Sequence, residues 1–216
     1  MTKTFKKAND AYEYYHDKII REGVKFGDTK ALFDVGFYIE NPLDNAIKNE
    51  ERKWNPIYAE AEWQWYLSGD RNTAKLKELY GKIPEIWKLM EDSQGNVNSN
   101  YGWQWKRNDQ IGCVINMLKE YPDTRQAAIS IYDCKEWDSY EYDTPCTYAV
   151  QFTILNSKLN MSVVMRSNDL WYGFCNDQYQ FSKLQHYIWN RLNIKDLEIG
   201  TYFHYAHNLH LYNNKI

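Results

Sequence analysis

The sequence predicts an α+β fold built as one domain over residues 1–216. Patterns typical of helices and of strands are interleaved along the chain, without the regular strand–helix–strand alternation of a doubly wound sheet. A length of 216 residues suits one hydrophobic core, and no linker rich in Pro, Gly or Ser divides it. Hydrophobic residues make up 44% and charged residues 25%, which is the balance of a folded globular protein.

The N-terminal half is predicted to be mainly helical. A helix is expected over Phe5–Ile20, where large apolar residues recur at helical spacing and Gly23 supplies a stop. A strand follows over Ala31–Ile39. Every second residue from Phe33 to Ile39 is apolar (Phe33, Val35, Phe37, Ile39), so these side chains would share one face of the strand. Further helices are expected over Pro56–Leu67, Thr73–Tyr80, Pro84–Met90 and Gln110–Lys119, with a polar, turn-rich connection over Ser93–Asn100.

Strands dominate the second half of the chain. Apolar patterning predicts them over Ala127–Tyr132, Thr147–Leu155 and Leu159–Arg166, and the last two are joined by a tight polar turn over Asn156–Lys158. A long helix is expected over Asn176–Leu192 and a final strand over Thr201–Tyr212.

Composition excludes several classes of protein. The net charge is −3, from 26 basic and 29 acidic residues, so no basic field is available for binding duplex nucleic acid through its phosphates. No apolar run approaches the ~20 residues that a membrane-spanning helix needs. The four cysteines form no CxxC pair and the first residues lack the apolar core of a signal peptide, so we expect reduced thiols and a cytoplasmic protein. Aromatic residues reach 17%, which offers flat surfaces for planar ligands.

Taken singly, residues such as Cys146 and His210 have ordinary structural explanations, but eight blocks of residues occur in a fixed order. The first block runs from Glu62 through two Trp residues to Gly69-Asp70-Arg71-Asn72. The others are Ile86-Trp87, Tyr101-Gly102-x-Gln104-Trp105, Pro122-Asp123-Thr124-Arg125, Pro145-Cys146, Arg166-Ser167-x-Asp169, Gly173 and His210-x-Tyr212. In order and spacing, this set resembles the thymidylate synthase family. The resemblance implies a large mixed or antiparallel sheet covered by helices, and a homodimer formed sheet to sheet.

Finer detail is similar to one branch of that family, the deoxycytidylate hydroxymethylases of phages. The similar segments are Asn98–Trp103, Met165–Asp169 and Gly173–Asp177, and Cys146 is followed by Thr147 as in that branch. Pro145 is instead the synthase-like residue. A phage-encoded member would act in the host cytoplasm.

Asp177 stands where thymidylate synthases have Asn, and this difference predicts the base. Uracil presents an N3–H donor beside an O4 acceptor, which one carboxamide satisfies. Cytosine presents an N4 donor beside an N3 acceptor. A carboxyl group accepts from N4 and shares a proton with N3, so Asp177 predicts a cytosine ring and hence dCMP rather than dUMP.

The resemblance implies covalent catalysis by Cys146. Its thiolate, favoured electrostatically by Arg166, would add to C6 of the pyrimidine and make C5 nucleophilic. C5 would attack the one-carbon unit of 5,10-methylenetetrahydrofolate, the co-substrate, while Asp177 protonates N3 and Glu62 organises water for proton transfer. Addition of water would give 5-hydroxymethyl-dCMP. No metal is implied.

The resemblance also implies how the two substrates are held. The nucleotide would be bound by Arg166, Ser167, Asn168, Tyr101, His210 and Tyr212. The folate would be bound by Trp87, Asp169, Tyr172 and Gly173. In this family the loop that carries Arg125 reaches into the partner's site, so Arg125 implies an obligate homodimer.

Three departures from the family pattern leave alternatives open. Gln126 replaces a second phosphate-binding Arg, Asp28–Lys30 is a shortened counterpart of an N-terminal loop, and the sequence ends four residues after Tyr212, at residue 216, so we expect an open folate site. One alternative keeps the fold but makes a methyl product or acts on dUMP. Another is a nucleotide-binding subunit without turnover.

Overall fold

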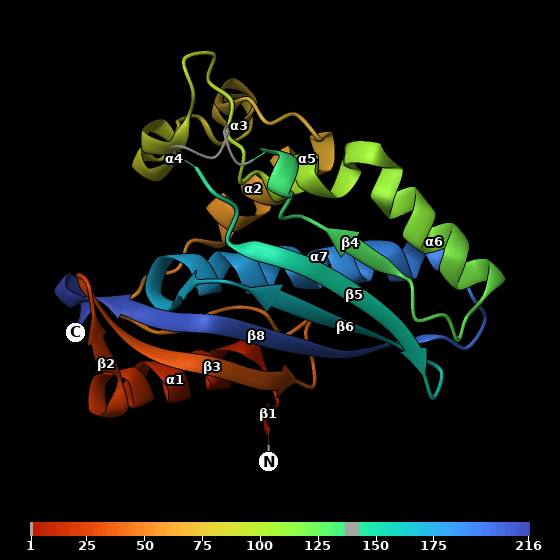
Figure 1. Ribbon diagram of the computed structural model, residues 1–216, viewed down its shortest axis with the longest axis horizontal. Coiled ribbons are helices and arrows are strands. Elements are labelled where there is room, and N and C mark those ends of the chain that lie inside the picture. The colour runs from red at the N-terminus through yellow and green to blue at the C-terminus, as the bar shows by residue number, and fades with distance from the viewer. Residues whose placement is uncertain (1, 137–142) are drawn as a thin grey trace.

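The computed structural model describes residues 2–136 and 143–216, and in them the predicted α+β class is confirmed. One mixed sheet of eight described strands runs through the molecule in the order β1-β3-β8-β6-β5-β4, with β2 beside β3 and β7 beside β8 (Figure 1). The strands are β1 (Lys3–Phe5), β2 (Val24–Phe26), β3 (Thr29–Ile39), β4 (Ala128–Ser130), β5 (Thr147–Leu155), β6 (Lys158–Met165), β7 (Asn168–Asp169) and β8 (Glu198–Tyr212).

Helices pack around this sheet (Figure 1). They are α1 (Ala8–Glu22), α2 (Pro56–Ser68), α3 (Thr73–Tyr80), α4 (Glu85–Met90), α5 (Tyr101–Lys106), α6 (Gln110–Glu120) and α7 (Cys175–Leu192), with short turns η1 (Arg107–Asp109), η3 (Leu170–Phe174) and η4 (Asn213–Lys215). Helices α2 to α5 gather above one end of the sheet in Figure 1, and α1 lies below β3.

The pairing of the central strands combines both directions. Strand β8 runs antiparallel to β3 and parallel to β6, while β5 and β6 form a hairpin. The hairpin turns through Asn156 and Ser157, which both have positive φ (52° and 56°), as the tight turns between twisted strands require. The polar turn predicted there is confirmed.

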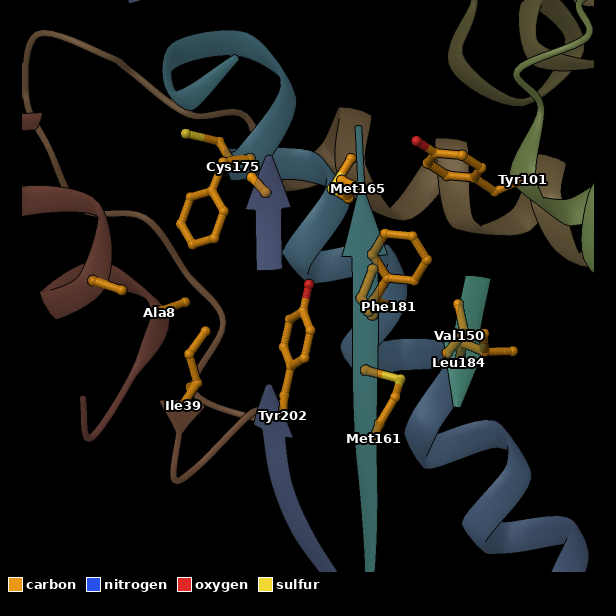
Figure 2. Packing of buried hydrophobic residues seen from close by; sticks show 14 of the residues in the cluster. Ala8, Ile39, Tyr101, Val150, Met161, Met165, Cys175, Phe181, Leu184 and Tyr202 are labelled. Atoms are coloured by element: carbon orange, nitrogen blue, oxygen red, sulfur yellow. The ribbon is translucent and has the colours of Figure 1, made fainter. Parts of the chain in front are cut away.

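One face of the sheet carries the core. Alternate residues of β3, β5, β6 and β8 point to this face and pack against α1 and α7. Figure 2 shows Phe181 and Leu184 of α7 beside Val150 of β5 and Met161 of β6, with Tyr202 of β8 next to them. All five side chains are buried, so this layer anchors the strands that carry the site.

Most of the predicted elements exist with small shifts in their bounds, but the N-terminal prediction is wrong at its start. Phe5 does not begin a helix; it ends β1 and pairs with Ile39 of β3. Three residues gain ladder hydrogen bonds there, a tertiary gain that helical periodicity does not report. Phe33 was expected on the buried face of its strand but is 39% exposed, because the left-handed backbone of Asp34 (φ 54°) interrupts the alternation.

Two further segments differ from the prediction. The strand predicted over Ala127–Tyr132 is shorter in the structure: β4 has three ladder residues, and the flanking Ala127 and Ile131 each keep one backbone hydrogen bond to β5, both at 2.8 Å. Helix α5 was not predicted at all: its six residues are too few for a periodic signal, and Asn100 begins it by accepting a hydrogen bond from the Trp103 N–H at 2.8 Å.

Helix α2, which carries Glu62, has clear start and stop signals. The side chain of Asn55 accepts from the backbone N–H groups of Ile57 and Tyr58, and Pro56 follows it at the first helical position. Gly69 ends the helix in the left-handed conformation (φ 71°). The predicted Pro56–Leu67 helix is thus confirmed with one more residue.

Helices α2 and α5 cross at Gly102, and this contact sets how the site is assembled. A Cβ at Gly102 would lie 2.0 Å from the Tyr66 carbonyl oxygen, so the two backbones touch. We expect Gly102→Ala to lower the free energy of unfolding by about 3 kcal/mol, because backbone atoms cannot move aside as a side chain can. Chemical denaturation measures this loss.

Gly112→Ala in α6 is the matched control. The atoms nearest to its new Cβ would be those of the Asp109 carboxylate, which can rotate away. Since Ala also favours a helix interior, stability should stay the same or rise by about 0.5 kcal/mol. Equal losses in the two variants would contradict the close crossing at Gly102.

Candidate active site

A single large cavity brings the predicted site residues together. It has a volume of about 980 Å³ and lies between α2, α4, η3, the start of α7 and the ends of β5, β6 and β8. Every predicted site residue except Arg125 lines it. These residues are Cys146, Glu62, Asp177, Arg166, Ser167, Asn168, His210, Tyr212, Tyr101, Trp87, Asp169, Tyr172 and Gly173.

The Cys146 thiol lies at the start of β5 beside a guanidinium group. Arg166 Nη2 is 3.7 Å from Sγ, and the same side chain donates to the carbonyls of Pro145 (3.0 Å) and Thr144 (2.9 Å). These bonds fix the guanidinium against the turn that precedes the thiol.

Two opposing effects act on this thiol. Burial raises the pKa of Cys146 to about 11, and Arg166 works against that rise. The expectation that Arg166 favours the thiolate is therefore supported in its sign. Burial and the nearby carboxyl group of Asp177 outweigh it in the free protein.

Asp177 points into the cavity from the first turn of α7 and is held by a neighbour. Asn168 Nδ2 donates to Asp177 Oδ2 at 2.7 Å. Burial raises the pKa of Asp177 well above its ordinary value, and the charge of Glu62 adds to the rise. In its protonated form, which burial favours, this carboxyl group offers one donor and one acceptor. The buried Asn168 Oδ1 has no hydrogen-bond partner among the described residues.

Glu62 is 3% exposed and both its oxygens are occupied. Tyr58 OH donates to Oε1 at 2.6 Å, and Gln180 Nε2 donates to Oε2 at 2.9 Å. Burial raises the pKa of Glu62 to about 7, while these two hydrogen bonds restrain the rise. A carboxyl group that titrates near neutrality can both accept and return a proton.

The last strand supplies two rings at the rim. His210 and Tyr212 lie on one face of β8, as predicted, with ring centroids 5.4 Å apart. His210 Nδ1 is 2.8 Å from Asn208 Oδ1, and burial lowers the pKa of His210. Tyr101 OH accepts a hydrogen bond from Thr147 Oγ1 at 2.9 Å on the opposite wall.

The outer part of the cavity is aromatic and apolar. Trp87 stands edge-on to Trp65 at 5.4 Å, and Tyr172 is 49% exposed at the mouth. Ile86 and Leu89, on the same short helix as Trp87, also expose their side chains there. Such a surface fits a planar ring system that stacks on side chains.

Asp169 and Gly173 shape the floor of this outer part. Asp169 accepts from the backbone N–H groups of Trp171 (2.9 Å) and Tyr172 (3.0 Å), so its carboxylate begins η3, and burial raises its pKa. A Cβ at Gly173 would lie 3.1 Å from Asn168 Nδ2 and 3.2 Å from Asp177 Oδ2. Glycine therefore keeps the space over this pair open.

Two basic residues lie away from the cavity. Arg125 is exposed on the connection between α6 and β4 and does not line the site within one subunit. Lys30, the counterpart of a family loop residue, donates to the Ile20 carbonyl at the end of α1. Of the basic residues predicted to bind the phosphate, Arg166 therefore lines the cavity of its own subunit, next to the predicted phosphate ligand Ser167, whereas Arg125 does not.

Sequence reasoning missed several residues of the cavity. Tyr58, Tyr66 and Asp143 line it without having been singled out. Tyr58 precedes Glu62 by one helical turn, so the i, i+4 spacing was the available signal. Asp143 is buried and accepts from the Ser99 N–H at 2.7 Å, a contact between distant segments that no local pattern reports.

Residues 2–136 and 143–216 contain no group of three or more His, Cys, Asp or Glu side chains arranged to hold a metal ion. In the same residues, no helix is long and apolar enough to cross a membrane.

Comparison with known proteins agrees with the geometry. A family model described as thymidylate synthase matches residues 18–216. The deoxycytidylate 5-hydroxymethyltransferases of Enterobacteria phages T4, T2 and T6 are each 32% identical to this chain, over 83% of it and 69% of their own length. The chain therefore belongs to the thymidylate synthase family, whose members are folate-dependent one-carbon transferases.

Proposed function

We propose that the protein is a deoxycytidylate 5-hydroxymethyltransferase, which transfers the one-carbon unit of 5,10-methylenetetrahydrofolate to C5 of dCMP and adds water. The observation that carries this proposal is the buried carboxyl group of Asp177, which accepts a hydrogen bond from Asn168 and lines the same cavity as the Cys146 thiol. The named activity of the phage relatives supports the same substrate.

Asp177 and Asn168 together suit the amino edge of cytosine. Because Asn168 Nδ2 donates to Asp177 Oδ2, that oxygen is the acceptor of the carboxyl group and the proton belongs on Oδ1. The acceptor oxygen then receives the cytosine N4–H, and the O–H donates to N3. Asn168 Oδ1, which no described residue contacts by a hydrogen bond, is a second acceptor for the amino group. Uracil would place O4, which is an acceptor, opposite the acceptor oxygen of Asp177, and both buried oxygens would then lack a donor.

The residues of this cavity can carry out the covalent steps. Cys146 Sγ, once deprotonated, bonds to C6 while the Asp177 proton passes to N3, so no negative charge accumulates on the ring. Arg166 lies 3.7 Å from the thiol, where it can stabilise the thiolate and bind the substrate phosphate. Glu62, with a pKa of about 7, would take the C5 proton through water. After water has added, N3 returns its proton to Asp177 and the C5=C6 double bond re-forms, so the C6–Sγ bond breaks and its electron pair leaves with sulfur as the thiolate.

The outer cavity fits the second substrate. Bound 5,10-methylenetetrahydrofolate would supply an electrophilic one-carbon unit. Trp87 and Tyr172 offer ring faces for it, and we call these two side chains the folate wall. Gly173 has no side chain that would fill the space between this wall and the Asn168–Asp177 pair. These side chains would exclude bulk water from one side of the ring and orient the reacting atoms.

Product analysis tests this proposal directly. The protein is incubated with dCMP, 5,10-methylenetetrahydrofolate and ¹⁸O-labelled water, and the nucleotide is analysed by mass spectrometry. We expect 5-hydroxymethyl-dCMP with one ¹⁸O atom in its new hydroxyl group. A methyl product with dihydrofolate formed would identify a reductive methylase. Product from dUMP alone would contradict the reading of Asp177, and nucleotide binding without product would indicate a subunit lacking turnover.

We also infer that the working unit is a homodimer formed through the open face of the sheet. Across this face, Tyr38 and Phe203 lie 4.7 Å apart as neighbouring rings, and Val164 and Ala149 continue the apolar surface on β6 and β5. No described helix covers these half-buried side chains. A second copy would cover them, and it would supply Arg125, which lies outside the cavity of its own subunit.

Mixing two inactive variants tests this dimer. Arg125→Ala and Cys146→Ser are each expected to be nearly inactive as pure dimers. After denaturation and refolding together, a mixed dimer contains one site with both Cys146 and the partner's Arg125. Random pairing should then restore about one quarter of parental activity. No recovery, or a monomer by sedimentation, would contradict the shared site.

A further inference from the structure

Tyr58 occupies a position between two residues that the proposed function uses. It lies on α2 one turn before Glu62, and its ring packs edge-on against Tyr80 at a centroid distance of 5.2 Å. Its hydroxyl group donates to Glu62 Oε1 at 2.6 Å and accepts from Trp87 Nε1 at 2.7 Å. All three side chains line the cavity.

The direction of this chain of hydrogen bonds is fixed by chemistry. An indole N–H can only donate, so the Tyr58 oxygen must accept from Trp87. The phenol has one proton, and the contact at 2.6 Å commits it to the Glu62 carboxylate. Burial raises the pKa of Tyr58 well above its ordinary value, so this proton stays on the phenol. Trp65 holds the Trp87 ring in place from the side.

We propose that Tyr58 is a positioning residue for Glu62: its hydroxyl, polarised by the Trp87 N–H, keeps the Glu62 carboxylate ionised and oriented toward the cavity as a proton acceptor. This inference rests on the proposed function, in which Glu62 manages the C5 proton. Because Trp87 also belongs to the folate wall, the chain links the surface that receives folate to the group that moves the proton.

The other groups around Glu62 do not replace Tyr58. Gln180 on α7 donates to the other oxygen, at 2.9 Å, and carries no charge. Asp177, also on α7, is an acid whose charge would oppose ionisation of Glu62. Tyr66 is a phenol on α2 whose pKa the Glu62 charge raises, and no hydrogen bond joins the two groups among the described contacts. Tyr58 is thus the donor that most restrains the rise in the pKa of Glu62.

Tyr58→Phe tests the inference, because it removes one oxygen and keeps the ring that packs on Tyr80. The carboxyl titration of Glu62 is followed by NMR in protein labelled with ¹³C at the Glu side-chain carbonyl, with Glu62→Gln to assign the signal. Loss of a hydrogen bond to the charged form should move the midpoint of about 7 upward by about one pH unit. Trp87→Phe removes the N–H that donates to Tyr58 and that also lowers the pKa of Glu62 directly, by less than Tyr58 does, so it should move the midpoint less and in the same direction.

Activity gives the second readout. With C5-tritiated dCMP and folate, the acidic limb of the pH profile of tritium release should move to higher pH by the same interval in Tyr58→Phe. The rate should approach the parental value on the alkaline side, since Glu62 is ionised there in both proteins. A purely structural role would lower the rate at every pH and leave the limb where it was.

Tyr179→Phe is the matched control. Tyr179 OH donates to Glu60 Oε2 at 2.7 Å, a phenol–carboxylate bond to the same helix but outside the cavity. Its loss should leave the Glu62 midpoint unchanged. An unshifted midpoint in folded Tyr58→Phe would overturn the inference. A shifted midpoint in a protein that forms no product from dCMP would uphold the Tyr58–Glu62 contact and reject the proposed function instead.

Discussion

Cys146→Ser is expected to reduce both product formation and C5 tritium release by at least about 10³-fold, with dCMP binding nearly retained. A Ser hydroxyl holds its proton far more tightly than a thiol, and it is the weaker nucleophile. The site already raises the pKa of Cys146 to about 11, so a less acidic group in the same surroundings would carry almost no anion. The phosphate and ring contacts do not involve sulfur, which is why binding should survive.

The covalent step can be observed directly with 5-fluoro-dCMP. Fluorine replaces the hydrogen that must leave C5, so the ring stays attached to sulfur once the one-carbon unit has joined it. Intact mass spectrometry of the parental protein should show one nucleotide and one folate added per chain, and Cys146→Ser should show neither. Cys113→Ser, which alters an exposed thiol outside the cavity, should form the same adduct as the parent. An adduct on Cys146→Ser would exclude this nucleophile.

Local pattern predicted the elements, and tertiary contact decided where the predictions failed. Helix Thr73–Tyr80 and strand Thr147–Leu155 have the predicted bounds, because the apolar period there agrees with the packing. Phe5 was misread because its pairing with β3 joins residues far apart in the chain. No property of the first ten residues reports that partner.

The candidate site also has a part that the sequence predicted, its residues, and a part that it did not predict, the contacts among them. The residues that line the cavity were identifiable because they fall in ordered blocks, and the fold then brings these blocks together. The contacts among them were not identifiable. The hydrogen bond from Asn168 to Asp177 and the one from Trp87 to Tyr58 each join different elements. They affect where the protons of Asp177 and Tyr58 lie, which the residue types alone do not reveal. Arg125 is the predicted site residue that does not line the cavity of its own subunit.

Asp177→Asn is expected to exchange the base that the enzyme uses. Addition of sulfur to C6 of cytosine requires a proton at N3, which a carboxyl group can give and a carboxamide cannot. We therefore expect kcat/KM for dCMP to fall by about 10³-fold. Uracil already carries its N3 proton and develops charge at O4, where an amide N–H can donate. Tritium release from C5-tritiated dUMP should rise above the parental level, as measured with both nucleotides in parallel.

Stability distinguishes this exchange from damage to the fold. Burial raises the pKa of Asp177 in the folded protein, so between the unfolded and the folded pKa an unfolded chain releases a proton that the folded chain keeps. Ionisation thus favours unfolding above the ordinary Asp pKa of about 4, increasingly as the pH rises toward the folded value. The neutral Asn lacks this opposition, so Asp177→Asn should melt no lower than the parent at pH 7 and its melting temperature should depend less on pH. A variant that melts as high as the parent yet keeps its preference for dCMP would contradict the role of this carboxyl group in choosing the base.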